Sequence, residues 1–239
     1  MTLDSLDMQL ALGSAAVLAI WTDVVPDAEA PFNEWYHREH MPDRLKVPGF
    51  RQGRRYRSFD GAPRYLAIYD VNSFATFSSR PYRSRLDHPT PQTCQIMPNF
   101  RNTTRALCRV SASAGSGVGG VLLSMWLSPQ NDQRDRLREW IAATLHSLHT
   151  TPGLCIVHAQ HWEAEQMELP ATREAMLRGN SDQSIDWAII IEASGLDEIS
   201  YARLRLLGGN SPLEAACQKP IVDVSYRFLF LLNSANADP

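Results

Sequence analysis

The segment EWYHREHMPDRLKVPGF, residues 34–50, gathers the side chains of this chain that are best suited to acid–base chemistry. Four residues share one face of the helix expected here, at the spacing i, i+3, i+4 and i+8: Phe32, Trp35, Tyr36 and His40. An imidazole with a near-neutral pKa can accept and donate a proton at physiological pH. The spacing makes His40 the candidate general acid or base, with Tyr36 beside it.

Pro42 is expected to stop or kink this helix, because its ring removes a hydrogen bond and disfavours helical geometry at Met41. A kink there would leave the imidazole of His40 free to point into a cavity. In the alternative, the imidazole of His40 satisfies backbone carbonyls at a helix C-terminus. The residues leave both roles open, whereas His37 is expected to be exposed and structural.

The strand expected after this helix is basic, with six basic residues and no acidic one between positions 44 and 59. Strand alternation places four residues on one face: Phe50, Gln52, Arg54 and Tyr56. Arg54 is the third catalytic candidate, because a guanidinium among aromatic rings can hold a substrate carboxylate or polarise a carbonyl. The alternative for Arg54 is an ion pair with Asp43, Asp60 or Asp70.

Aromatic side chains spaced by two residues line one face of several expected strands. Such residues are usually core filler, but they become a pocket wall where a strand lines a cavity. The substrate-binding candidates are Trp21, Trp35, Tyr56, Tyr65, Tyr69 and Phe100. Either Tyr65 or Tyr69 could donate a hydrogen bond to a substrate oxygen. The proline-rich connection 80–102, with His88 and Met97, is either a lid or a surface that packs against another subunit.

The elements that position these residues occur twice in the order βαββαβ. The first set comprises strands at 15–24, 49–58, 64–71 and 103–111 and helices at 29–40 and 73–80. The second comprises strands at 121–128, 154–163, 186–193 and 224–232 and helices at 131–148 and 196–207. Trp21 and Trp126 match at an offset of 105, a Ser/Gly/Ala linker fills 111–120, and an insertion occupies 164–183.

A four-stranded antiparallel sheet with helices on one face needs a second layer on the other. The predicted fold is therefore α+β: two ferredoxin-like βαββαβ repeats, 1–113 and 114–239, whose sheets pack into a single-chain dimeric-type α/β barrel. The cavity is expected between the two sheets. Because Thr144 or Leu145 aligns with His40, the first repeat is expected to carry the site and the second to close the barrel.

Three stretches resemble the EthD-like branch of the dimeric α/β-barrel superfamily over roughly residues 15–111: WYHREHMPDRLKVPGFRQGRRYR, GAPRYLAIYDV and FSSRPY. The resemblance implies a small, often aromatic molecule bound in the barrel and a histidine at its mouth. That histidine corresponds to His40, with His37 as the weaker match. The superfamily includes cofactor-independent monooxygenases, isomerases, cyclases and haem-dependent relatives, so the fold says little about the reaction.

These features lead to three functional hypotheses. The first is a cofactor-independent enzyme of isomerase, cyclase, decarboxylase or monooxygenase type, because the sequence holds no nucleotide-binding loop or catalytic triad order. The second is a non-catalytic protein that binds a hydrophobic metabolite. The third is a haem-binding protein that uses His158 or His161. These two histidines are three apart, so a regular strand points them in opposite directions, against a shared metal site.

The bulk composition limits the classes of binding partner and the cellular location that we expect. The chain has 239 residues, of which 44% are hydrophobic, and a formal net charge of −3, which gives no reason to expect nucleic acid. Asp4 and Asp7 stand where a signal peptide carries basic residues, and the following apolar run is too short to span a membrane. Four cysteines without metal-site spacing indicate a cytoplasmic protein. Exposed helix faces would allow a homodimer.

Overall fold

The computed structural model describes residues 16–167, 170–179 and 182–235, so Asp4 and Asp7 lie outside the described residues. Eight strands form a closed barrel in the order β1-β3-β2-β8-β5-β7-β6-β4, with every neighbouring pair antiparallel. Four consecutive neighbours, β4-β1-β3-β2, come from the first half of the chain and the other four from the second. The α+β barrel built from two βαββαβ halves is confirmed.

The strands of the first half are β1 Ala16–Val24, β2 Phe50–Ser58, β3 Tyr65–Val71 and β4 Phe100–Gly115. Those of the second half are β5 Val121–Leu127, β6 Ile156–Ala164, β7 Trp187–Ala193 and β8 Val222–Asn233. The barrel closes where β2 pairs with β8 and β4 pairs with β6. The expected linker is wrong over residues 111–115, because they continue β4 and pair with β6.

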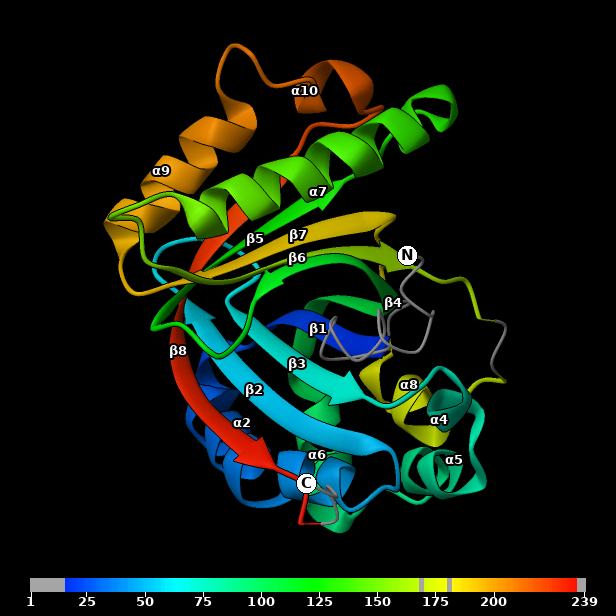
Figure 1. The fold of residues 1–239 in the computed structure, drawn as a ribbon. Helices are drawn as coiled ribbons and strands as arrows, with labels where there is room; N and C mark the ends of the chain where they lie inside the picture. Colours follow the sequence, from blue (N-terminus) through cyan, green and yellow to red (C-terminus); the bar gives the residue numbers. More distant parts are fainter. Residues whose placement is uncertain (1–15, 168–169, 180–181, 236–239) are drawn as a thin grey trace.

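Helices cover the outside of the barrel in two separate layers (Figure 1). The layer of the first half contains α2 Glu29–Trp35, α3 Met41–Leu45, α4 Ala75–Ser78, α5 Arg80–Asp87 and α6 Pro91–Ile96. The layer of the second half contains α7 Arg134–Thr150, α9 Leu196–Leu207 and α10 Leu213–Ala216. The proline-rich connection is thus largely helical, and its prolines Pro81 and Pro91 stand in first helical turns. No helix among the described residues is long and apolar enough to cross a membrane.

The helix that carries His40 does not end at Pro42. Between α2 and α3 it widens into a π-helical turn, Tyr36–His40, in which the backbone N–H of Met41 bonds to the carbonyl of Tyr36. The predicted stop at Pro42 is wrong, because the helix continues through α3 as far as Leu45, and the wider turn explains how it accommodates the proline. In a regular α-helix the proline ring clashes with the carbonyl four residues earlier, and the π turn relieves that crowding.

The inside of the barrel is packed with large side chains. Trp21 and Trp126, which occupy matching strands of the two halves, meet edge to face with ring centroids 5.3 Å apart. The indole N–H of Trp21 donates to the hydroxyl of Ser124 at 3.1 Å. Tyr56, Trp162 and other buried side chains of both sheets complete this cluster. The space between the sheets is therefore core, and the location predicted for the cavity is wrong.

A buried ion-pair network crosses this core. Nη1 of Arg54, on β2, bonds to Glu192 of β7, and its Nη2 lies 3.2 Å from Asp70 of β3. Glu192 also accepts the backbone N–H of Gly119 at 2.9 Å. Arg54 and Tyr56 face inward together, but a bulge between Phe50 and Gln52 turns Phe50 to the helical layer. The expectation that Phe50 shares the face of Arg54 is wrong for that reason.

Candidate functional site

A cavity of about 300 Å³ lies on the outer side of the first sheet, under the helical layer of the first half. Its floor is formed by β1, β3 and β4, and its walls come from the His40 helix, α5 and the segment before β4. The described residues of the 164–183 insertion close the remaining side, where α8 Arg173–Arg178 packs against α5 and α6. The cavity is therefore assembled from both halves of the chain, although its floor belongs to the first.

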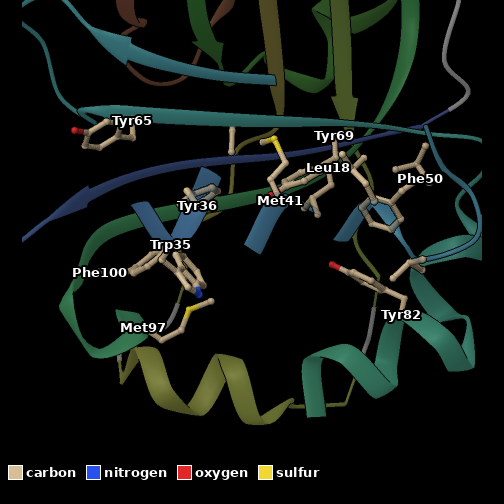
Figure 2. Close-up of a cluster of buried hydrophobic side chains, with 14 of the residues drawn as sticks. Leu18, Trp35, Tyr36, Met41, Phe50, Tyr65, Tyr69, Tyr82, Met97 and Phe100 are labelled. Carbon is tan, nitrogen blue, oxygen red and sulfur yellow. The ribbon is translucent and has the colours of Figure 1, made fainter. Parts of the chain in front are cut away.

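The apolar lining comes mostly from strands and from the segment around β4. Its larger side chains include Leu18, Ile20, Met97, Phe100, Leu107, Met167 and Ile185. Figure 2 shows Leu18 and Tyr69 on the sheet side, Tyr36 on the helix, and Tyr82 reaching in from α5. An apolar cavity with a few converging polar groups is typical of a small-molecule site.

His40 is buried and lines this cavity. Its ring stacks on the indole of Trp35 with centroids 4.1 Å apart and meets the ring of Tyr36 edge-on at 4.9 Å. Within the described part of the chain, no group hydrogen-bonds to either ring nitrogen. The alternative in which His40 satisfies helix-end carbonyls is wrong, because the helix continues through Leu45. The imidazole of His40 therefore borders the cavity without a hydrogen bond to the described part of the protein.

Burial and three arginines act on the protonation of His40. Burial lowers the pKa of His40 well below its ordinary value, and the charges of Arg44, Arg55 and Arg178 lower it further. The near-neutral pKa expected for this residue is therefore wrong. At pH 7 the imidazole is neutral, so it accepts a proton or a hydrogen bond rather than carrying a positive charge.

Three tyrosines line the same cavity. The hydroxyl of Tyr69 is buried and has no partner among the residues described. Tyr82 lines the cavity from α5, and its hydroxyl accepts a hydrogen bond from Nη2 of Arg105 at 3.1 Å. Tyr36 also lines the cavity, and burial raises its pKa, so its phenol stays protonated and can donate.

Arg105 differs from the other cations of the cavity. Arg44 pairs with Glu174, and Arg178 forms two hydrogen bonds to Asp182, at 3.0 and 2.7 Å. Arg105 faces the cavity from β4 and, within the described ranges, has no carboxylate partner. A half-buried guanidinium with unused donors can bind an anionic or strongly polarised oxygen.

The structure separates the residues predicted for the site into two groups. Tyr36, His40, Tyr69 and Phe100 line the cavity, and Trp35 supports the ring of His40 from behind. The others lie elsewhere. Arg54, Trp21 and Tyr56 belong to the barrel core, and the hydroxyl of Tyr65 donates to Glu29 at 2.5 Å near the opposite end of the helix. His88 is exposed and does not line the cavity.

Sequence reasoning missed the cavity residues Arg44, Tyr82, Arg105 and Glu174. Arg44 stands four residues after His40, a spacing that places it on the same helical face. Arg105 and Leu107 are two residues apart on β4, so strand alternation places both on the helical side of the sheet. Glu174 had no such signal, because its partner Arg44 is 130 residues away in the chain.

The second half has no matching arrangement. Thr144 and Leu145, which align with His40, are buried in an apolar core between α7, α9 and the second sheet. The ring of His158 forms a hydrogen bond with the hydroxyl of Ser113 at 3.0 Å, and the ring of His161 forms one with the hydroxyl of Ser111 at 2.7 Å. Neither histidine lines the cavity. No cluster of three or more metal-ligating side chains occurs in the described ranges.

Comparison with known proteins gives a likeness of fold. No protein-family model and no curated protein matches the sequence. Among solved structures, the chain is similar to an anthrone oxidase-like protein, with a TM-score of 0.66, 9% identity and coverage of 92% of this chain and 93% of that one. It is also similar to a provisional monooxygenase of Fusobacterium nucleatum subsp. nucleatum, with a TM-score of 0.59, 10% identity and coverage of 92% and 95%.

A third similar structure, a provisional monooxygenase of Lactobacillus acidophilus, has a TM-score of 0.57, 5% identity and coverage of 92% and 97%. These likenesses extend over nearly the whole chain at very low identity, so they concern the fold. The narrower resemblance to the EthD-like branch stays a prediction. The chain has the dimeric α/β-barrel fold, with both halves of the barrel supplied by one polypeptide.

Proposed function

We propose that this protein is a cofactor-independent enzyme that acts on a small phenolic or enolisable aromatic molecule in the cavity beside His40. The observation that carries the proposal is the neutral, unpaired imidazole of His40 in a largely apolar cavity, where the charges of three arginines lower its pKa. Tyr69 and Arg105 add a hydroxyl and a guanidinium with unused donors. Together they would bind the oxygen atoms of a flat apolar substrate.

The electrostatics favour a substrate that becomes an anion. The cations that disfavour an imidazolium at His40 stabilise a phenolate or enolate in the same place. His40 would accept the substrate proton, while Arg105 and the tyrosine hydroxyls hydrogen-bond to the oxygens that gain charge. His40 is therefore assigned the role of a general base, and Tyr36, which stays protonated, that of a hydrogen-bond donor.

An oxygenation is the reaction type that the structural relatives support best, since an anthrone oxidase-like protein and two provisional monooxygenases are among them. An ionised anthrone is electron-rich enough to reduce O2 without a bound cofactor. In the balanced reaction, the CH2 group of the anthrone and O2 give a carbonyl group and one molecule of water. Isomerisation and cyclisation would begin with the same proton removal.

The test measures oxygen uptake with 1,8-dihydroxyanthrone as the probe, in protein dialysed against EDTA. We expect one O2 consumed for each quinone formed, at a rate well above that of heat-denatured protein. His40→Gln should lower kcat by about 10²-fold or more, as expected for loss of a general base. His37→Gln is the matched control, because His37 lies on the same helix but is exposed outside this cavity.

The outcomes separate the three hypotheses. Anaerobic binding of the anthrone with no oxygen uptake would contradict the proposal and leave a binding protein. An absorbance spectrum of the freshly purified protein with a Soret band would favour haem instead. Full activity in His40→Gln would remove His40 from the mechanism even if turnover is observed.

A further inference from the structure

A second cavity, of about 260 Å³, lies on the far side of the His40 helix. It is bordered by that helix and by the junction of the two halves of the barrel, where β2 pairs with β8. Its lining includes Asn33 and His37 from the helix, Arg55 from β2, and Leu229 and Phe230 from β8. It shares no lining residue with the cavity beside His40. The ring of Tyr36 lies between Arg55 and that first cavity.

Arg55 is the unusual residue of this second cavity. Its side chain is 1% exposed, and its Nε and Nη2 have no hydrogen-bond partner within the described residues. The guanidinium carbon lies 3.8 Å from the ring centroid of Tyr36, 4.6 Å from that of Phe32 and 4.8 Å from that of Tyr65. The three rings attract the charge but leave these N–H donors unused.

Burial lowers the pKa of Arg55 to about 10, so the guanidinium remains a cation at neutral pH. Nearby charges do not neutralise it. Arg57 and Arg64 lie 3.3 and 3.1 Å from Glu29, and that carboxylate also accepts from Tyr65. Arg57 and Arg64 therefore share one carboxylate, and Arg55 has no ion pair in the described part of this region, which leaves a positive excess. A buried cation without a matching anion is costly, and a bound anion relieves that cost.

We propose that this second cavity is a binding site for a small carboxylate with an apolar body, such as an aromatic acid, held by the guanidinium of Arg55. A carboxylate supplies two acceptor oxygens that match the N–H donors of a guanidinium. Leu229 and Phe230 provide the apolar wall, and Phe230 is also in ring contact with His37 at 4.9 Å. The lining of this site is separate from that of the first cavity, and binding there does not depend on the proposed reaction.

The test is a ¹⁹F NMR titration with 4-fluorobenzoate as the probe and 4-fluorobenzyl alcohol as its neutral counterpart. We expect saturable binding of the benzoate and at least tenfold weaker binding of the alcohol. Arg55→Met should weaken benzoate binding at least tenfold, with circular dichroism checking the fold. Arg105→Gln, which changes the unpaired cation of the first cavity, should leave this binding unchanged.

A second variant keeps the test decisive if Arg55→Met fails to fold. Leu229 is 36% exposed, so Leu229→Glu should be tolerated, and its carboxylate would repel the benzoate or occupy its place. Leu204→Glu, at a position that is 72% exposed on α9, is the matched control and should bind like the wild type. Benzoate binding that survives Leu229→Glu, or that is lost in Arg105→Gln instead, would overturn the proposal. Binding retained in His40→Gln would show that this site stands even if the proposed enzyme activity fails.

Discussion

Arg44, on the helix that carries His40, forms a buried ion pair with Glu174, which lies in the insertion of the other half of the chain. Both side chains are about 5% exposed, so the pair is shielded from solvent. The pair joins the wall of the cavity to the segment that closes it. The charge of Arg44 also contributes to the low pKa of His40.

Breaking this pair from one side should be strongly destabilising. Glu174→Gln leaves the charge of Arg44 buried without its partner, and such changes cost about 3–5 kcal/mol of unfolding free energy. Urea unfolding at pH 7 measures the loss. Glu165→Gln is the matched control, because the pair of Glu165 with Arg109 is exposed and should cost less than about 1 kcal/mol. Equal losses in the two variants would mean that the Arg44–Glu174 pair is solvated.

The protonation of His40 should respond to Arg55 through the ring of Tyr36. We expect the imidazole of His40 to be neutral at pH 7 and to stay neutral below its ordinary pKa, because burial and three arginines lower its pKa. Arg55→Met removes one of these positive charges and should raise the pKa of His40. NMR titration of the imidazole signals measures both values. Arg57→Met is the control, since Arg57 is paired with Glu29 and should shift the pKa of His40 little. An unchanged pKa in Arg55→Met would contradict the electrostatic link.

Acid should destabilise the fold through His161. Burial lowers the pKa of His161 to about 4, whereas the unfolded chain has a value near 6.5. Between these values the unfolded state binds the proton and the folded state does not, so stability is full above pH 6.5 and falls as the pH decreases towards 4. At pH 5 the loss from this one group is about 2 kcal/mol.

His161→Gln should remove that part of the pH dependence. The quantity to compare is the difference in unfolding free energy between pH 7 and pH 5, because the substitution also changes stability at neutral pH. His146→Gln is the matched control, since His146 is exposed on α7. If both variants keep the wild-type pH dependence, His161 is protonated in the folded state at pH 5.

The fold could be predicted from the sequence because its signals are local. Strand alternation and the Pro-Gly turns depend on residues that are close in the sequence. The matching positions of Trp21 and Trp126 reveal a simple repeat. Alternation assigns a side chain to a face of the sheet, but it does not say which face is packed and which borders a cavity. That depends on volume: Trp21, Trp126 and Trp162 fill the barrel interior, so the cavity lies on the opposite face.

The site could be predicted only where it depends on one helix. The spacing of Tyr36 and His40 placed both on the buried face, and the structure keeps them together despite the π turn. The contact between Arg44 and Glu174 joins residues 130 positions apart, across an insertion with no counterpart in the first half. Arg54 shows the same limit in part: its partner Asp70 was among the expected carboxylates, whereas Glu192 belongs to the other sheet and could not be identified from strand alternation.

Strand alternation could not decide between Tyr65 and Tyr69 as the hydrogen-bond donor to the substrate. Loss of the hydroxyl should change stability and ligand binding in opposite ways at these two positions. Tyr69 has a buried hydroxyl without a described partner, and such a group costs the folded state about 1–3 kcal/mol. Tyr69→Phe should therefore leave the protein as stable or more stable while it weakens binding of a phenolic ligand, because the donor to the substrate oxygen is lost. Tyr65→Phe removes the hydrogen bonds to Glu29 and Asn33, at 2.5 and 2.9 Å, and should lower stability with little effect on that binding. Urea unfolding and anaerobic fluorescence titration with the anthrone measure the two quantities on the same samples. If Tyr69→Phe loses stability and keeps its affinity, its hydroxyl is part of the fold rather than of the site, and the hydrogen bonding of the substrate would rest on Tyr82 and Arg105.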